Sequence, residues 1–418
     1  MTACTIVARN YLAHARVLAA SYARHHPGRR LSVLVVDAAA AAEALRAEPF
    51  ETVLPDQLPL SEDEFRCMAS IYEVMELATA LKPFFLRFLL DRGSEVALFL
   101  DPDIEIFAPL DEVERLGREH GIVLIPHTLR PIPADGRKPT SAELAVSGVY
   151  NLGFIAVARS ARPCLEWWGA RLRRDCLVAP EEGLFVDQRL MDFLPAFFTP
   201  CIFRDPTYNV AYWNLHEREV TWTGARYEVA GAPLRFFHFS GFDPMIPDVL
   251  SKHQGTTPRI VLGAHPDLAR LCREYAEHLF AAGYHNCVRA PYGFATTAHG
   301  VPFDRVMRRV YRKGLLNAER GAGPAPPDPL DPREAAAFIE WVGTPQVLEA
   351  LSPRSRAAAL IQDGPYLGSQ FKLVRLAQRA LLRVLRPLII HEQLVARALL
   401  QTVDEITDHR NGGNPHLP

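Results

Sequence analysis

The sequence predicts an α/β fold in which helices cover a largely parallel sheet. In the first half of the chain, short apolar runs rich in β-branched residues alternate with longer segments of helical periodicity. Polar residues directly follow several of these runs, as is typical where strand ends meet a ligand. We therefore expect a buried sheet with a functional edge.

Near-continuous apolar runs are expected to form strands that are buried on both faces, as parallel strands usually are. The runs are Thr5–Ala8, Ser32–Asp37, Val96–Asp101 and Ile122–Pro126, with Tyr150–Ala158 as a further candidate. The segments Tyr11–His25 and Ile71–Leu90 have the length and periodicity of helices.

The ends of the predicted strands are the first place to look for a site, because ligands of open α/β sheets bind outside the carboxyl ends of the strands. The polar residues found there are Arg9-Asn10, Asp37 and Asp101-Pro102-Asp103.

The chain changes in character after the α/β unit. The predicted parts are residues 1–255, a helical continuation at 256–320 with helices at Asp267–Ala282 and Phe303–Arg320, a proline-rich connector at 321–332, and a helical region at 333–410. The connector accounts for part of the high proline content, 34 residues in 418.

Charge and cysteine content exclude some classes of function. The 46 basic and 48 acidic residues give a formal net charge of −2, which argues against generic nucleic-acid binding. The seven cysteines include no C-x-x-C pair, so we expect reduced thiols and no zinc site. We see no signal peptide and no membrane-spanning stretch, and we expect a cytoplasmic protein.

Asp101 and Asp103 form a D-x-D motif at the end of a predicted buried strand. Hard divalent cations such as magnesium and manganese favour oxygen ligands of this kind. The motif is common by chance, and the alternative interpretation is a solvated turn. Its place at a strand end raises the case for a metal site.

Other motifs have both a functional and a structural interpretation. His238, in F-H-F-S-G, is by itself more often a satisfied core histidine than a ligand. Asp187, in V-D-Q, is a candidate helix N-cap, and Asn151 and Gly153 are candidate turn residues. Lys82 is either a point charge for a phosphate or a solvated lysine.

The order of these motifs is more specific than any one of them. Along the chain come Lys82, Asp101-x-Asp103, Asn151-x-Gly153, Asp187-Gln188, Asn209 and His238. In this order the sequence resembles the GT-A-fold glycosyltransferases of family eight, the group of glycogenin and the bacterial lipooligosaccharide galactosyltransferases, over roughly Thr2 to His253. It also looks similar to uncharacterised bacterial glycosyltransferases with a helical C-terminal part. The resemblance implies a Rossmann-like GT-A domain with a mixed, mainly parallel sheet and an α-helical C-terminal extension.

The resemblance also implies roles for the matching residues. Asp101, Asp103 and His238 would hold a divalent metal, manganese(II) or magnesium(II). Asp187 and Gln188 are the implied catalytic residues, which position or stabilise the donor sugar. The implied donor-binding residues are Ala8, Asn10, Tyr11, Asp37, Lys82, Asp101, Pro102, Asp103, Asn151, Gly153, Asp187, Gln188, His238, Gly241 and Lys252.

One departure from the family concerns its late motif, H-x-x-G-x-x-K-P-W, whose lysine binds the diphosphate. Here the motif is H-F-S-G-F-D-P, without that lysine, and Asp243 would repel a phosphate. Lys252 is a candidate to replace the missing charge.

The resemblance implies metal-dependent transfer of a sugar from a nucleoside-diphosphate donor, a UDP-sugar, to an unidentified acceptor with retention of configuration. The alternatives are a haloacid-dehalogenase-type phosphatase and a non-catalytic nucleotide-sugar-binding protein. The phosphatase motif continues to Thr or Val where this chain has Glu105. A sugar nucleotidyltransferase is disfavoured because A-R-N-Y, and no glycine-rich phosphate loop, follows the first strand.

Two further segments bear on partners. The proline-rich stretch between His127 and Val149 is either an acceptor-facing loop or an ordinary surface excursion. The basic positions between Phe371 and Leu400 suggest either peripheral contact with the inner face of a membrane or packing on the catalytic unit, and we favour packing. Those positions are Lys372, Arg375, Arg379, Arg383, Arg386 and Arg397.

Overall fold

The computed structural model describes residues 1–38, 42–345 and 347. The chain divides into two compact units, of which the first spans Met1–Arg312 and the second begins at Lys313. The main sheet of the first unit has the strand order β10 (Cys201–Ile202), β6 (Ile122–Pro126), β7 (Tyr150–Ala158), β4 (Val96–Leu100), β1 (Thr2–Val7), β2 (Ser32–Val35) and β3 (Glu51–Val53). Within it, β7 runs antiparallel to both neighbours and the other pairings are parallel. This confirms the predicted α/β fold with a mixed, mainly parallel sheet.

Smaller sheets complete the strand pairing. β5 (Ile104–Ile106) pairs antiparallel with β14 (Phe236–His238), and β8 (Val178–Ala179) pairs antiparallel with β9 (Leu184–Phe185). The third small sheet contains β11 (Val220–Trp222), β12 (Tyr227–Val229) and β13 (Ala232–Pro233).

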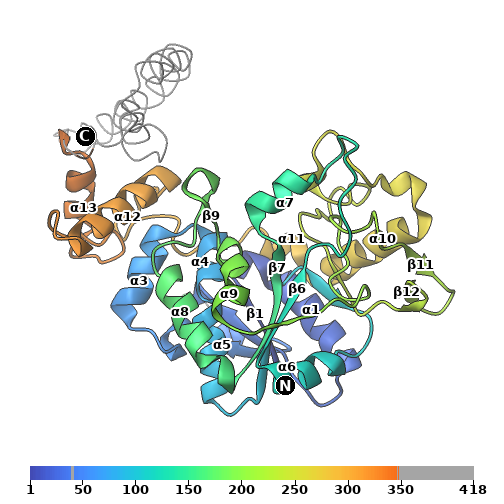
Figure 1. The fold of residues 1–418 in the computed structure, drawn as a ribbon. Coiled ribbons are helices and arrows are strands. Elements are labelled where there is room, and N and C mark those ends of the chain that lie inside the picture. The colour runs from blue at the N-terminus through green and yellow to red at the C-terminus, as the bar shows by residue number, and fades with distance from the viewer. Residues whose placement is uncertain (39–41, 346, 348–418) are drawn as a thin grey trace, which may run out of the picture. The chain divides into compact units, whose positions relative to one another are not determined.

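Helices cover both faces of the main sheet (Figure 1). The α-helices are α1 (Leu12–His25), α2 (Ala42–Leu45), α3 (Glu62–Ile71), α4 (Val74–Ala80), α5 (Lys82–Asp91), α6 (Asp111–His120), α7 (Ser141–Ser147), α8 (Arg162–Leu172), α9 (Leu194–Phe197), α10 (Pro266–Ala281), α11 (Tyr284–Cys287), α12 (Arg305–Glu319) and α13 (Ala335–Val342). α1 and α6 lie on one face, and α5 and α8 lie on the other (Figure 1). Strand residues alternate accordingly, so that Leu98 packs toward α1 while the Phe99 ring faces Lys82.

The single helix predicted at Ile71–Leu90 is wrong, because the chain breaks there into the end of α3, α4 and α5. Tyr72 is extended, with φ −106° and ψ 139°. The Glu76 side chain then accepts the backbone N–H of Glu73 and caps the start of α4. Pro83 stands in the first turn of α5, where its missing N–H is tolerated, and it cannot continue the preceding helix.

The sheet gathers the candidate residues at one edge. Asp37, Asp101 and His127 follow the carboxyl ends of β2, β4 and β6. Because β7 is antiparallel, its amino end with Asn151 lies at the same edge. This reversal explains why a residue at the start of a strand joins residues that follow strand ends.

Within the predicted helical region 333–410, the structure places α13 in the second unit. Residues from 348 onward, including the basic positions between Phe371 and Leu400, lie outside the described residues. In the described part of the chain, no helix combines the length and apolar character needed to cross a bilayer.

Candidate functional site

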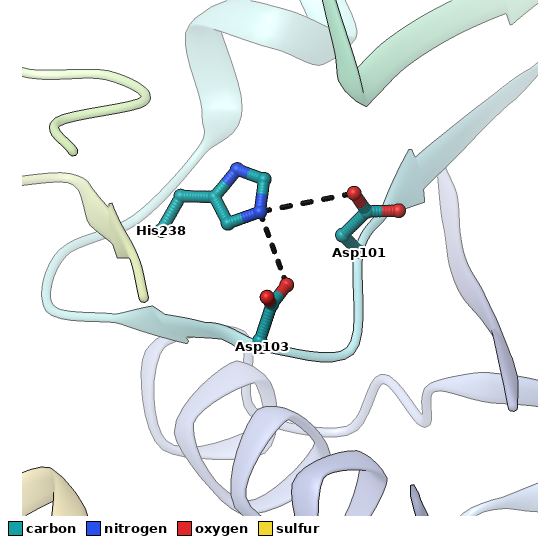
Figure 2. Close-up of side chains that lie close together, drawn as sticks. All are labelled: Asp101, Asp103 and His238. Carbon is teal, nitrogen blue, oxygen red and sulfur yellow. Dashed lines mark ion pairs between the residues drawn. The ribbon is translucent and has the colours of Figure 1, made fainter. Parts of the chain in front are cut away.

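Asp101, Asp103 and His238 converge at the carboxyl edge of the sheet (Figure 2). One candidate ligand atom from each residue lies within 4.8 Å of the other two. His238 Nε2 is 3.0 Å from Asp103 Oδ1 and 3.7 Å from Asp101 Oδ2. The structure therefore brings the three residues predicted as metal ligands together, and their donor atoms are of the kinds that divalent cations bind.

Long-range strand pairing brings His238 to the two aspartates. Asp101 continues the β4–β7 ladder, because its N–H donates to the Gly153 carbonyl oxygen at 2.8 Å. The chain then turns, and β5 pairs with β14 so that Ile104 lies opposite His238. The histidine is thereby held beside a turn that precedes it by more than a hundred residues.

Gly153 leaves the space that this cluster occupies. A Cβ atom at this position would lie 2.4 Å from His238 Cε1, 2.8 Å from Asp101 Oδ2 and 2.9 Å from Asn151 Oδ1. All three distances are shorter than a carbon atom tolerates, so the N-x-G motif needs glycine for close approach and not for turn geometry.

Burial and neighbouring charges shift the pKa values of the three cluster residues in opposite directions. Burial by itself lowers the pKa of His238, but the carboxylates of Asp103 and Asp101 raise it above its usual value. Burial raises the pKa of Asp101, and Lys82 and His238 oppose this shift only in part. Burial also acts to raise the pKa of Asp103, yet the neighbouring His238 brings it below its usual value.

Lys82 lies beside this cluster and is 2% exposed. Its Nζ lies 2.8 Å from the Leu152 carbonyl oxygen, 3.0 Å from Asp187 Oδ2 and 3.5 Å from Asp101 Oδ1. Burial acts to lower the pKa of Lys82, but the two carboxylates raise it. Burial raises the pKa of Asp187 to about 6, with Lys82 opposing the shift. The ammonium group therefore holds two acidic side chains of the site together.

Amide side chains link the remaining motifs. Asn151 Nδ2 donates to Gln188 Oε1 at 3.3 Å, and Gln188 Oε1 also accepts the Leu152 N–H at 3.0 Å. Asn209 Nδ2 donates to Asn151 Oδ1 at 3.2 Å. Asn209 Oδ1 is 3.4 Å from His238 Nδ1. A proton on Nδ1, directed at Asn209, would leave Nε2 as the metal-binding nitrogen of His238.

Sequence reasoning gave no role to three residues of this network. Asn209 appears in the motif order without an assigned role. In the structure its backbone is left-handed, with a φ of 53°. His127 Nδ1 is 3.1 Å from the Val149 carbonyl oxygen, and its Nε2 is 3.3 Å from Asn151 Nδ2. Asn214 donates to the carbonyl oxygens of His127 and Asn209 at 2.9 Å each. His127 directly follows β6, so the strand-end rule was a signal for it, whereas nothing marked Asn214.

The Ala8–Tyr11 turn follows β1 at the same edge. The Tyr11 N–H donates to the Ala8 carbonyl oxygen at 2.9 Å. Asn10 Oδ1 is buried and accepts no hydrogen bond from the described residues. Tyr11 is 43% exposed as a residue, and its ring stacks on His14 at a centroid distance of 4.2 Å. The unpartnered amide oxygen of Asn10 leaves a hydrogen-bond acceptor unused in this turn.

Asp37 is already engaged by the protein. Its Oδ1 accepts the Arg9 N–H at 2.9 Å, and its Oδ2 accepts the Gly293 N–H at 3.1 Å. A Cβ atom on Gly293 would lie 2.8 Å from Asp37 Cβ, so these segments approach closely. Asp37 thus joins the end of β2 to the segment around Gly293, and any donor contact would be additional to this role.

A backbone hydrogen bond joins Gly241 of the late motif to Lys252. The Lys252 N–H donates to the Gly241 carbonyl oxygen at 2.9 Å, and Gly241 has a φ of 71°. The Lys252 side chain is exposed, and among the described residues it forms no ion pair with Asp101 or Asp103. Pro102 lies in the turn between the two aspartates.

The stretch between His127 and Val149 contains a helix where a loop was expected. α7 begins after Thr140, whose side chain accepts the Glu143 N–H in a capping box. Before α7, the Lys138 N–H donates to the Thr257 carbonyl oxygen, and the Arg259 N–H donates to the Lys138 carbonyl oxygen. The segment is therefore fixed at two points.

Comparison with known proteins gives partial matches. No protein-family model matches the chain. The chain is 29% identical over 173 residues to the uncharacterized protein YfnF of Bacillus subtilis (strain 168), which covers 40% of this chain and 57% of YfnF. It is 27% identical over 249 residues to the uncharacterized protein YfnD of the same strain, which covers 57% of this chain and 76% of YfnD. The chain thus matches little more than half the length of YfnF.

Some solved structures are also similar. Galactosyltransferase LgtC, in complex with donor and acceptor sugar analogs, matches with a TM-score of 0.38 and 15% identity over 67% of this chain and 96% of that chain. A glycosyltransferase involved in the glycosylation of the major capsid of PBCV-1 matches with a TM-score of 0.36 and 13% identity over 67% and 100%. The glycosyltransferase GlyE of Streptococcus pneumoniae TIGR4 matches with a TM-score of 0.36 and 13% identity over 70% and 66%.

Proposed function

We propose that this chain is a metal-dependent glycosyltransferase that moves a sugar from a nucleoside-diphosphate donor, a UDP-sugar, to an acceptor with retention of configuration. The observation that carries the proposal is the convergence of Asp101, Asp103 and His238 at the sheet edge. Carboxylate oxygens suit magnesium and manganese, and the imidazole nitrogen favours a transition metal. Manganese(II) is therefore the preferred ion. The ordered motifs that resemble family eight surround this cluster, which supports the same reaction.

The chain's own residues have distinct tasks in this mechanism. Asp101, Asp103 and His238 would hold a divalent cation, which would supply positive charge to stabilise the leaving diphosphate. Lys82 Nζ lies near three oxygen atoms, the Leu152 carbonyl oxygen and one carboxylate oxygen each of Asp187 and Asp101. We therefore assign Lys82 to holding the carboxylates in place, with a secondary electrostatic effect on the diphosphate.

Retention is what the resemblance to family eight implies, and the contacts of Asp187 and Gln188 bear on how it would be achieved. Gln188 Oε1 accepts two hydrogen bonds, and its Nε2 donates to the Ser147 carbonyl oxygen at 2.9 Å. Asp187 is 1% exposed and paired with Lys82. Neither side chain is a free nucleophile, so we infer that no covalent sugar–enzyme intermediate forms. Retention would then require attack on the same face of the sugar, assisted by the departing diphosphate. Asp187 and Gln188 then shape and orient the sugar site.

Donor profiling tests the proposal. The full chain is incubated with manganese(II) and a panel of nucleotide sugars, and release of nucleoside diphosphate is measured. We expect turnover of at least one UDP-sugar, abolished by chelation. Release of inorganic phosphate from simple esters would instead indicate a phosphatase, and binding of a nucleotide sugar without turnover would indicate a non-catalytic protein. Either result overturns the proposal.

A further inference from the structure

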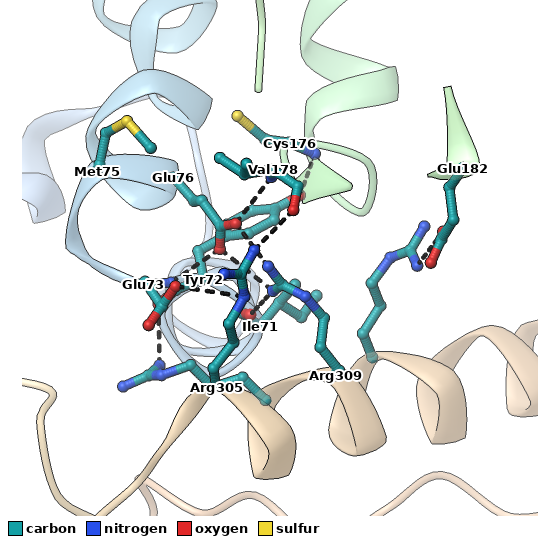
Figure 3. Close-up of polar contacts among 12 residues, drawn as sticks. Ile71, Tyr72, Glu73, Met75, Glu76, Cys176, Val178, Glu182, Arg305 and Arg309 are labelled. Atoms are coloured by element: carbon teal, nitrogen blue, oxygen red, sulfur yellow. Dashed lines mark hydrogen bonds and ion pairs between the residues drawn. The ribbon is translucent and has the colours of Figure 1, made fainter. Parts of the chain in front are cut away.

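We propose that α12 positions the Asp187–Gln188 segment of the site through a row of arginines. This inference rests on the proposed function, because it assigns a task to residues that lie outside the donor site. Arg305, Arg308, Arg309 and Arg312 all belong to the first unit and reach side chains and carbonyl groups of other segments. Figure 3 shows Arg309 reaching Glu76 from α12.

Glu76 is the buried residue through which α12 contacts the other segments, and it is 1% exposed. Arg309 donates to both of its carboxylate oxygens, at 2.6 Å and 3.2 Å. Glu76 Oε1 also accepts the Val178 N–H at 2.9 Å, and Oε2 accepts the Glu73 N–H at 3.1 Å. One buried carboxylate therefore ties α4 to α12 and to strand β8.

Both elements that Glu76 joins lead directly to the site. α4 is followed by α5, whose first residue is Lys82. β8 pairs with β9, and the Val186 N–H donates to the Leu177 carbonyl oxygen at 2.8 Å immediately before Asp187. Val186 has a φ of 42°, a conformation that a β-branched residue adopts only when its surroundings impose it. The Lys82–Asp187 ion pair is thus assembled from two segments that share Glu76.

The other arginines hold the same region. Arg312 donates to the Arg174 carbonyl oxygen at 2.6 Å and to Asp175 Oδ1 at 2.7 Å. Arg305 donates to the Val178 carbonyl oxygen at 2.6 Å. These contacts fix the chain between α8 and β8, so α12 restrains the segment that enters the β8–β9 hairpin before Asp187.

Of the four arginines, Arg309 is the one whose substitution should most directly affect Glu76. Without it, Glu76 keeps its backbone donors but stays buried with no cation, which is unfavourable for a carboxylate. Moving toward water would then hydrate the Glu76 carboxylate and lower its free energy. Because the Val178 N–H donates to this carboxylate, Val178 would move with it. We expect Arg309→Gln to loosen residues 176–188 while the core of the sheet stays intact.

Hydrogen–deuterium exchange on the full chain tests the placement independently of activity. We expect at least ~10-fold faster exchange at residues 176–188 in Arg309→Gln, with unchanged exchange in β1 and β4. Arg115→Gln is the matched control, because Arg115 lies on α6 and makes exposed pairs with Glu112 and Glu119. Unchanged exchange at 176–188, or equal loosening in β1 and β4, overturns the proposal.

Kinetics separate positioning from simple loss of structure. For a donor identified by profiling, we expect Arg309→Gln to lower kcat about 10-fold while KM for the donor and manganese(II) affinity stay within about twofold. Glu76→Gln in the Arg309→Gln background removes the uncompensated charge and should restore slow exchange. If Arg309→Gln does not fold, Arg309→Lys is measured instead; it keeps the charge but loses the paired donation to both Glu76 oxygens, so we expect a smaller loosening confined to residues 176–188. An unchanged kcat beside faster exchange overturns the positioning role, and lack of any donor turnover refutes the proposed function without altering the exchange result.

Discussion

Lys82 Nζ lies 3.0 Å from Asp187 Oδ2 in a position where both side chains are almost fully buried. The lysine begins α5 and the aspartate follows β9, so the pair joins two segments that are distant in the sequence. Asp101 is the second carboxylate near the same ammonium group. The pair therefore connects the predicted metal cluster to the predicted sugar-binding residues, and its partners compensate each other's charge.

Lys82→Met should strongly destabilise the fold, because it leaves the Asp187 carboxylate buried without a cation. We expect a loss of about 3–5 kcal/mol in the free energy of unfolding, as for other broken buried ion pairs. Urea unfolding followed by circular dichroism measures it. Adding Asp187→Asn should recover part of the loss. Arg115→Ala breaks exposed pairs and should cost less than about 1 kcal/mol. Equal losses for Lys82→Met and Arg115→Ala would contradict this assignment.

Asp103→Asn should weaken manganese(II) binding at least ~10-fold, because it removes an anionic oxygen from a three-residue donor set. Electron paramagnetic resonance titration of free manganese(II) measures the affinity directly. The far-ultraviolet circular dichroism spectrum should not change. Asp63→Asn, at an exposed position on α3, is the control and should bind as the unmodified chain does. Binding that survives Asp103→Asn would show that the cluster is not the metal site.

Local patterns predicted the sheet well. β6 and β7 begin and end where the apolar runs Ile122–Pro126 and Tyr150–Ala158 do. The strand-end rule pointed to Asp101 and Asp103, because it depends only on which residue follows a buried strand. The motif order then added His238, whose sequence context alone favoured a core histidine.

What the sequence did not predict depends on contacts between distant segments. The pairing of β5 with β14, which brings His238 to Asp103, has no local signal. The break between α3 and α4 is stabilised by Glu76, whose partners on α12 and β8 are remote in sequence. Asn214 acts through the carbonyl oxygens of His127 and Asn209, and such a role leaves no motif behind.

Gly153→Ala should disrupt the metal cluster with little effect on the rest of the sheet. The added Cβ would meet His238, Asp101 and Asn151 at 2.4–2.9 Å, so at least one of these side chains must move. We expect manganese(II) affinity to fall ~10-fold or more and the free energy of unfolding to fall by about 1–3 kcal/mol. Gly263→Ala is the matched control, because a Cβ there meets nothing within 4 Å. If Gly153→Ala binds manganese(II) normally, the cluster tolerates displacement and the close-approach argument is wrong.

His127 should make stability depend on pH in a defined window. Burial lowers the pKa of His127 from 6.5 to about 4, and the hydrogen bond with the Val149 carbonyl oxygen opposes this shift. The neutral ring matches its neighbours, because Nδ1 can donate to that oxygen while Nε2 accepts from Asn151 Nδ2. Between pH 6.5 and about 4 the unfolded chain binds a proton on this ring that the folded chain does not. The contribution of His127 to the free energy of unfolding therefore falls as the pH drops, by up to about 3 kcal/mol across the window.

Urea unfolding at pH 7, 6 and 5 measures this dependence. His127→Gln has no titrating ring, so its free energy of unfolding should fall less between pH 7 and pH 5 than that of the unmodified chain. His120→Gln, at an exposed position at the end of α6, should leave the pH dependence unchanged. The same slope in His127→Gln and in the unmodified chain would mean that the proton is taken up elsewhere. The neutral His127 would then not be what keeps Asn151 oriented toward the cluster.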